Sequence, residues 1–282
     1  MYAPVNDNVV GNKFNLLIKT LFAGLFICVP TWAVAAASSV FLEELTTTEL
    51  TAAMRDGKTT IIIPVGGTEQ SGPHVALGKH NIRVKALAGK VAQTLGNTLV
   101  APVIAYVPEG GISPPTGHMR FAGTISVPEG AFKAILDGAA RGFKQHGFVN
   151  IVLLGDHGDY QPALKAVASS LNRDWVKSPA RAHFVEDYYR AAQTTYIQAL
   201  KAKGLTDMQI GTHAGTADTS LLMAIDPSMV RPEQFATAAH DGAATGTRGD
   251  PRASTAALGQ LGIDAIVNQT VTSIRSAVAG PR

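Results

Sequence analysis

The sequence has a single cysteine, Cys28, among 282 residues, so it offers only one thiol. That cysteine lies in a segment that we expect to be removed, so the mature chain would have no disulfide and no thiolate metal ligand. The formal net charge is only +3 and the basic residues are scattered, which gives no footprint for nucleic acid. A Gly-x-Ser-x-Gly elbow is also missing, which argues against a serine hydrolase. Carboxylates and imidazoles remain as the main candidates for chemistry.

The N-terminal segment has the order of a secretory signal. Lys13 and Lys19 come before a short apolar run at 21–29, and an alanine-rich stretch ends at Ala37. The apolar run is too short for a comfortable membrane span. We therefore predict a signal peptide over 1–37, cleaved after Ala35 or Ala37, and a periplasmic or secreted product without stable membrane association. An uncleaved anchor is the alternative.

Strands and helices are predicted to alternate along the rest of the chain. Continuous apolar runs at 59–65 and 149–154 are typical of strands buried on both faces. Further strands are predicted at 99–107, 123–127 and 182–185. Helical patterns cover 46–54, 81–95, 129–146, 161–171, 188–202, 218–225 and 254–278. This alternation predicts one α/β domain over 38–282, a three-layer sandwich with a mostly parallel sheet and helices on both faces.

Three polar loops, at 66–80, 155–160 and 212–218, are predicted to follow strands. The carboxyl ends of parallel strands share one edge of a sheet, so these loops can converge. Their acidic and imidazole side chains are Glu69, His74, His80, Asp156, His157, Asp159, His213 and Asp218. Carboxylates and imidazoles without thiols suit Zn, Mn or Fe, and such a site favours metal-assisted hydrolysis. The plainer alternative is that these residues cap helices or lie on the surface.

Five short motifs follow one another between about residues 45 and 275. They are Glu69-Gln-Ser-Gly-Pro-His74, Phe121-Ala-Gly-Thr-Ile-Ser126, Asp156-His157-Gly158-Asp159, His213-Ala-Gly-Thr-Ala-Asp218-Thr-Ser220 and Gly249-Asp-Pro251. In this order they resemble the creatininase family, the creatinine amidohydrolases and related metal-dependent amidases. The first motif matches the family's Glu-Gln-His-Gly-Pro-His in five of its six positions.

The resemblance implies a dinuclear metal centre whose ligands map onto Glu69, Ser71, His80, His157 and Asp159. Ser71 stands where the family has a histidine, and His80 stands where it has an aspartate that bridges the two ions. A neutral imidazole has one free lone pair and cannot bridge. We therefore expect one tightly held Zn²⁺, or Mn²⁺ or Fe²⁺, on Glu69, His80 and His157, with a weak second site at Asp159.

Further roles follow from the same resemblance. His213 would act as the acid/base that protonates the leaving nitrogen, and Asp218 would hold His213 or the substrate. Asp159 would orient or deprotonate the attacking water. Ser113 and Gly158 are the predicted substrate-binding positions. His74 is expected to support the ligands from behind, and His118 is expected only to pack its loop.

The resulting hypothesis is an exported metal-dependent amidohydrolase that cleaves a small cyclic or linear amide with a metal-activated water. The alternative is a degenerate family member that binds a ligand or partner without catalysis. The Ser71 and His80 departures leave both open. The resemblance also implies a homo-oligomer, a hexamer in the family, with no nucleic-acid partner.

Overall fold

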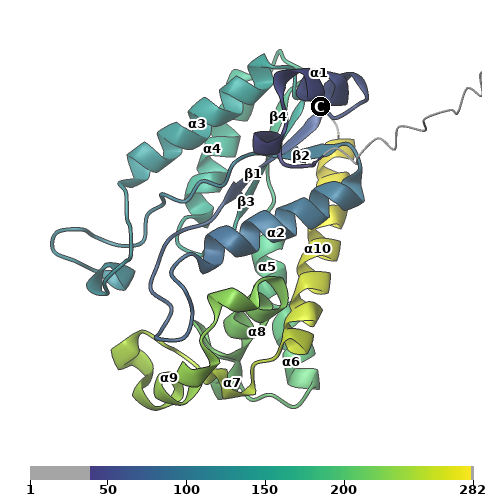
Figure 1. Cartoon of the computed structure of the whole chain (residues 1–282). Helices are drawn as coiled ribbons and strands as arrows, with labels where there is room; N and C mark the ends of the chain where they lie inside the picture. Colours follow the sequence, from purple (N-terminus) through teal and green to yellow (C-terminus); the bar gives the residue numbers. More distant parts are fainter. Residues whose placement is uncertain (1–38, 281–282) are drawn as a thin grey trace, which may run out of the picture. The chain divides into compact units, whose positions relative to one another are not determined.

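The structure is a computed structural model that describes residues 39–280. The predicted signal peptide and its cleavage site lie outside this range and stay a prediction. Four parallel strands form one sheet in the order β2–β1–β3–β4 (Figure 1). Their bounds are Thr60–Val65 for β1, Thr98–Val100 for β2, Asn150–Gly155 for β3 and Arg181–Phe184 for β4.

Helices cover both faces of the sheet. In chain order they are α1 (Thr47–Arg55), α2 (Lys79–Leu95), α3 (Glu129–Gln145), α4 (Gln161–Asp174), α5 (Asp187–Gln193), α6 (Thr195–Ala202), α7 (Asp207–Ile210), α8 (Thr216–Ile225), α9 (Phe235–Asp241) and α10 (Ala256–Ala279). The predicted start near Thr46 is confirmed, because Thr46 and Glu49 form a reciprocal capping box at the beginning of α1.

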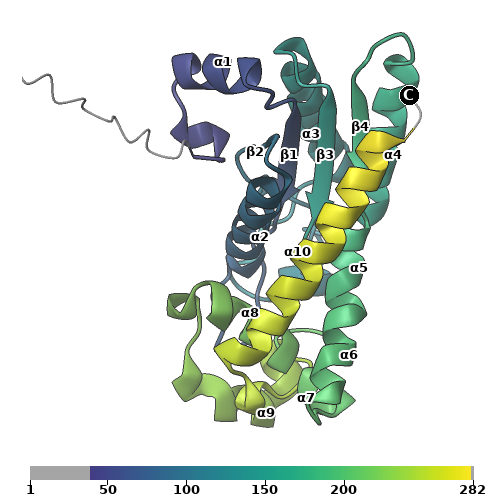
Figure 2. The same cartoon turned by 90° about the vertical axis from the view of Figure 1, so that its right-hand side faces the viewer.

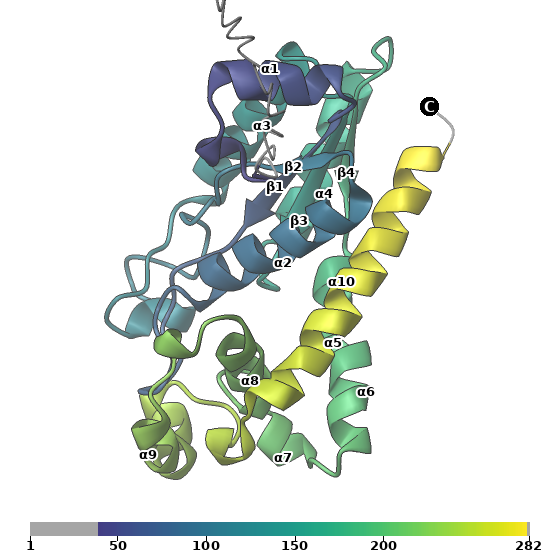
Figure 3. The same cartoon turned by 45° about the vertical axis from the view of Figure 1, so that its right-hand side comes forward.

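Alternate side chains of the central strands face two separate cores. Ile61 and Ile63 of β1 point toward α3 and α4, where they meet Phe132, Leu136 and Leu164. On the opposite face Ile62 of β1 and Val152 of β3 pack against α2, α5 and α10. Figure 3 shows α2 and α10 together on this second side. The predicted three-layer α/β sandwich is therefore confirmed.

Several predicted boundaries were wrong. The strand expected over 99–107 ends at Val100, because Pro102 has no N–H to continue the ladder. Residues 123–127 form no strand and contribute only single backbone hydrogen bonds, from Ile125 to Thr68 and from Val127 to Val107. The helix expected over 188–202 is broken at Thr194 into α5 and α6. In residues 39–280, no helix has the length and apolar content to cross a membrane.

The register of the central strands brings two of the polar loops together. Val65, the last residue of β1, lies opposite Gly155, the last residue of β3. The segments that follow them, 66–78 and 156–160, therefore start side by side at one edge of the sheet. The third loop, 212–215, was expected after a strand but joins α7 to α8. An antiparallel bridge between His213 and Arg248 ties it to the later segment 246–250.

Long helices carry that third loop to the sheet edge. Figure 2 shows α10 running alongside the sheet from the group formed by α7, α8 and α9. The approach of α10 to α8 is very close at Gly259, where an added Cβ would lie 1.9 Å from the Ser220 carbonyl oxygen. Glycine is required there by the contact between the two backbones.

Candidate metal centre and substrate pocket

Glu69 is held at the edge of the sheet by the fold of the loop after β1. Its backbone N–H donates to the Leu77 carbonyl at 3.1 Å, which closes the loop on itself. The N–H of Gly67 donates to the Asn81 side chain at 2.9 Å, which ties the loop to the start of α2. The Glu69 side chain is fully buried as a result.

Two histidines from other loops converge on one oxygen of Glu69. His118 Nε2 lies 3.2 Å from Glu69 Oε2, and His157 Nε2 lies 3.5 Å from the same oxygen. His118 comes from the short 3-10 helix at Gly117–Arg120, and His157 follows β3. These three residues form the one group in residues 39–280 whose ligand atoms all lie close enough together to hold a metal ion.

The group fits a divalent metal ion. Glu69 Oε2 is buried and has no hydrogen-bond partner, which is costly for a carboxylate unless a cation serves it. Ligand atoms about 2.0–2.1 Å from a tetrahedral zinc lie roughly 3.3–3.4 Å apart, close to the two distances found here. Two imidazoles and one glutamate are also an established catalytic zinc set with a fourth position open.

The other oxygen of Glu69 is already engaged. His80 Nε2 lies 2.8 Å from Oε1, and the buried ammonium of Lys79 lies 3.2 Å from it. Burial alone would raise the pKa of Glu69, but Lys79 and His80 hold that pKa well below its usual value. The carboxylate is therefore charged, with one oxygen paired and one available.

His80 occupies a position between two carboxylates. Its Nδ1 lies 2.6 Å from Asp156 Oδ2, while its Nε2 faces Glu69. Because both ring nitrogens have carboxylate partners, His80 is not part of the metal-binding group. Its predicted role as a ligand stays a prediction, and in this geometry it links Glu69 to Asp156.

Arg83 extends this network behind the site. Its Nε donates to Asp156 at 2.7 Å, and its Nη1 donates to Asp218 at 2.7 Å. Asp218 also accepts from Lys79 at 3.4 Å and from the backbone N–H of Ala214 at 2.9 Å. Lys79 and Arg83 hold the pKa of Asp218 far below its usual value despite the opposing effect of burial. Asp218 thus anchors the cations of α2, and its predicted catalytic role stays untested.

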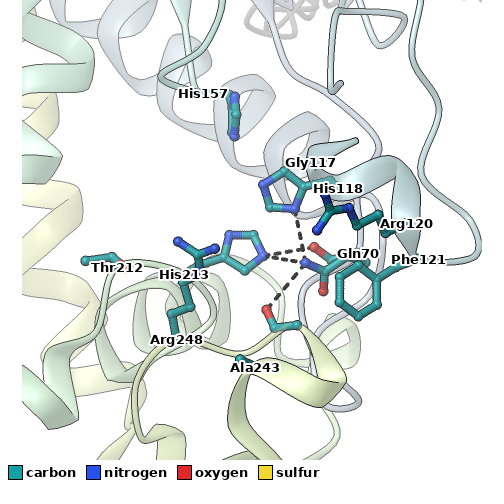
Figure 4. A pocket seen from close by; sticks show the side chains of 11 residues that line it. Gln70, Gly117, His118, Arg120, Phe121, His157, Thr212, His213, Ala243 and Arg248 are labelled. Atoms are coloured by element: carbon teal, nitrogen blue, oxygen red, sulfur yellow. Dashed lines mark hydrogen bonds between the residues drawn. The ribbon is translucent and has the colours of Figure 1, made fainter. Parts of the chain in front are cut away.

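A pocket of about 550 Å³ opens beside the metal-binding group. Figure 4 shows its lining residues, with the rings of His118, His157 and His213 around it. The full lining consists of Gln70, Gly117, His118, Arg120, Phe121, His157, Thr212, His213, Ala243, Gly246 and Arg248. This size is ordinary for a small-molecule site.

His213 lines this pocket in a defined orientation, and its predicted acid/base role stays a prediction. Its Nε2 donates to the Gln70 carbonyl at 2.9 Å, which assigns the proton to Nε2 and leaves Nδ1 as the lone-pair nitrogen. Nδ1 lies 3.7 Å from Glu69 Oε1. Burial, followed by the charge of Lys79, lowers the pKa of His213 to about 3. The ring is therefore neutral near pH 7, with its lone pair on Nδ1.

The other predicted site residues lie farther from this centre. Asp159 is exposed beside His157, and its backbone N–H donates to His157 Nδ1 at 3.3 Å. Ser113 is exposed in its loop, and Gly158 packs against the hydroxyl of Tyr189. Neither lines the pocket. The predicted roles of these three residues stay predictions.

His74 is buried and away from the metal-binding group. Its Nε2 donates to the Ala214 carbonyl at 3.0 Å, and its ring packs edge-on against Phe235. Burial lowers the pKa of His74 to about 4. His74 holds the loop that carries His213, and its predicted role behind the metal ligands stays a prediction.

Sequence reasoning missed several residues of the site. The expectation that His118 only packs its loop was wrong, because His118 Nε2 lies 3.2 Å from Glu69 Oε2 and is part of the group that could hold a metal ion. Lys79 and Arg83 were assigned no role, and neither was Glu109, which is buried with neither carboxyl oxygen hydrogen-bonded. Burial, then the charges of Glu69 and Asp159, raise the pKa of Glu109 to about 9. The one available signal was the position of His118 directly before the Phe121–Ser126 motif.

Comparison with known proteins adds a family assignment. Residues 43–274 match the family model described as creatinine amidohydrolase. A creatinine amidohydrolase from Pseudomonas putida is 26% identical over 200 residues, which covers 68% of this chain and 74% of that protein. A mycofactocin precursor peptide peptidase from Mycolicibacterium smegmatis is 27% identical over 180 residues, covering 62% and 61%.

Solved structures share the fold. A creatininase structure with Mn in its name and a mutant creatininase of Zn–Zn type each superpose with a TM-score of 0.71. Both are 23% identical to this chain, and each match covers 86% of this chain and 100% of the other. At this identity the likeness supports the fold, while the family model carries the family assignment.

Proposed function

Because the chain belongs to the creatininase family of metal-dependent amidohydrolases, we propose that it hydrolyses a carbon–nitrogen bond in a small cyclic or linear amide. One divalent ion, zinc in our proposal, would be held by Glu69, His118 and His157. The observation that carries this proposal is the buried Glu69 Oε2, which has no hydrogen-bond partner and faces two imidazole nitrogens.

The chain's own residues supply binding and proton transfer. The ion would act as a Lewis acid that brings the pKa of water to about 7 and polarises the amide carbonyl. His213 Nδ1 accepts a proton from the attacking water and later returns it to the leaving nitrogen, while Gln70 holds the ring through Nε2. Asp159, on the rim beside His157, remains our candidate for orienting that water.

The surroundings of Glu69 favour one ion over two. Its Oε1 is already contacted by His80 and by the ammonium of Lys79, a buried positive charge that repels a second cation. Ser71, where the family pattern has a histidine, offers only a neutral hydroxyl. We therefore propose one tightly bound ion per chain.

Elemental analysis of the purified mature protein tests this proposal. We expect close to one zinc-like ion per chain after dialysis, and hydrolysis of at least one compound in a panel of small amides. Glu69→Gln should remove both, whereas Glu129→Gln, an exposed control on α3, should change neither. Two bound ions would contradict the single-ion assignment. Absence of both metal and hydrolysis would favour a family member that binds a ligand without catalysis.

The charge of the pocket narrows the proposed substrate class. Arg120 lies beside His118 and Arg248 beside His213 (Figure 4), and no carboxylate is among the lining residues. Neither arginine forms a side-chain ion pair within residues 39–280. A neutral or anionic amide therefore suits this pocket better than a cationic one.

Paired substrates test this charge preference. Amides of equal size that carry a carboxylate should have a higher kcat/KM than those that carry an ammonium group. Changing both arginines to glutamine should lower kcat/KM for the carboxylate series by about tenfold, roughly 1.4 kcal/mol. The exposed Arg55→Gln variant serves as the control. An unchanged preference in the double variant would refute this part of the proposal.

A further inference from the structure

Glu109 is a buried acid that the proposed reaction does not yet use. It lies in the loop after β2 and is 1% exposed. Its backbone N–H donates to Ser126 Oγ at 3.0 Å, and the neighbouring Val107 carbonyl accepts from Val127, so the segment is fixed on both sides. Both carboxyl oxygens are buried without a hydrogen-bond partner. A buried acid with no partner usually has a ligand-related reason to be there.

The nearest imidazole to this carboxyl group is that of His157. Glu109 Oε2 lies 3.7 Å from His157 Nδ1, while His157 Nε2 faces Glu69 Oε2 on the metal-binding side. The carboxyl groups of Glu109 and Glu69 therefore face different nitrogens of one ring. Glu109 is not itself a member of the metal-binding group.

The chemistry of a histidine ligand requires a partner at Nδ1. When Nε2 gives its lone pair to a metal ion, the proton of the neutral ring must be on Nδ1. In the described geometry the backbone N–H of Asp159 donates to Nδ1 at 3.3 Å, so this hydrogen bond must give way when Nδ1 carries the proton. Glu109 Oε2 can accept it, and an approach of about 0.5–1 Å brings the pair to hydrogen-bond distance.

We propose that Glu109 is a positioning residue: it accepts the Nδ1 proton of His157 and so presents the Nε2 lone pair to the metal ion. The inference rests on the proposed metal centre. The arrangement needs the ionised form of Glu109, which a bound cation favours over the neutral acid. The resulting carboxylate–histidine–metal arrangement fixes the orientation of the ring and raises its basicity as a ligand.

The backbone near Glu109 is shaped to admit this side chain. Gly67 has a φ of +150°, and a Cβ at that position would lie 2.5 Å from Glu109 Oε1. The loop that carries Glu69 therefore leaves room for a second carboxyl group directly behind the site. A residue that only filled space would need neither the carboxyl group nor this glycine.

Zinc affinity of Glu109 variants tests the inference without any activity assay. Glu109→Met removes the acceptor while keeping the bulk, and we expect zinc affinity to fall 10–100-fold in competition with a chromogenic chelator. Glu109→Gln keeps one acceptor oxygen and should lose less. The thermal stability of the metal-free protein should stay equal or rise in both variants, because a buried unpaired acid is removed. Glu129→Met, at an exposed position, is the matched control.

A second measurement, by NMR, detects the proton on His157 Nδ1. In ¹⁵N-histidine NMR of the zinc-loaded parent, the signal assigned by a His157→Gln variant should show a protonated Nδ1 and a metal-bound Nε2. In Glu109→Met this Nδ1 signal should shift or broaden.

The outcomes separate the two proposals. Parent-like zinc affinity and an unchanged Nδ1 signal in both Glu109 variants would overturn the inference while leaving the metal centre intact. A parent protein that binds no zinc would overturn both. If Glu109→Met does not fold, the Glu109→Gln affinity and NMR signal decide.

Discussion

At the scale of single residues, the two carboxylate oxygens of Glu69 have different surroundings. Oε1 is paired with Lys79 and His80, which keeps the carboxylate charged, while Oε2 faces His118 and His157 without a hydrogen bond. The division explains how a fully buried acid can be both stabilised by the protein and available to a cation. It also separates the role of His80 from that of His118.

The two histidines should therefore respond differently to substitution. His118→Ala removes a proposed ligand, so we expect zinc affinity to fall by more than about 100-fold. His80→Ala should weaken zinc binding about 10–100-fold, and it should also reduce the free energy of unfolding by roughly 3–5 kcal/mol, because Glu69 and Asp156 lose their shared partner. Chelator competition and urea denaturation measure the two effects. A His80→Ala protein that binds no zinc but keeps its stability would restore His80 as a ligand.

His74 provides a prediction on pH at the same scale. Its pKa is about 4 in the folded chain and about 6.5 when unfolded, so the unfolded state binds more protons between these values. The stabilising contribution of neutral His74 is complete above pH 6.5 and declines as the pH falls toward 4. The full change is at most roughly 3 kcal/mol.

Paired denaturation curves isolate this contribution. His74→Gln keeps a donor for the Ala214 carbonyl but cannot titrate, so its stability should fall less between pH 6.5 and 4.5 than that of the parent. The relevant quantity is the difference between parent and variant at each pH, because other buried histidines titrate in both proteins. A difference that is constant with pH would contradict the assignment.

At the scale of elements, the sheet edge and the α8–α10 contact position the site together. The β1–β3 register starts the Glu69 and His157 loops side by side, while α8 and its preceding loop bring His213 to the same place. Because α10 packs tightly on α8 at Gly259, this contact holds α8 in place against the helix that covers the sheet. The loop before α8, which carries His213, is thereby positioned at the pocket.

Two glycine-to-alanine variants test how tight that contact is. Gly259→Ala should destabilise the protein by about 1–3 kcal/mol, because the new Cβ would collide with the Ser220 carbonyl. Gly138→Ala, in exposed α3 with no atom within 4 Å of the new Cβ, should stabilise it by about 0.5–1 kcal/mol. Thermal denaturation compares them. Equal gains in both variants would mean that α8 and α10 are farther apart than described.

At the scale of the whole molecule, the cellular localisation of the protein remains a proposal. We propose that it is exported, because a basic segment, a short apolar core and an alanine-rich exit occur in the order of a signal peptide. N-terminal sequencing of the periplasmic or secreted protein should begin at Ala36 or Ser38. A membrane-bound product that still begins at Met1 would show that the segment is an anchor.

The sequence by itself determined the layered fold and part of the site. Apolar runs at 59–65 and 149–154, each with helical patterns before and after, favour a parallel sheet covered on both faces. Glu69 and His157 could be picked out because each directly follows one of these strands. His213 was found through its motif, although its loop proved to follow a helix.

Only the tertiary structure revealed that His118 lies at the site and that buried charged residues surround it. His118 lies in a loop rich in glycine and proline, where no periodicity indicates which way a side chain points. Lys79 and Glu109 would ordinarily be expected at the surface, and their burial becomes visible only when distant segments meet. Local patterns encode strands and helices, but the closure of loops onto a shared edge depends on contacts between residues far apart in the chain. That closure places His118, as well as His80, against Glu69.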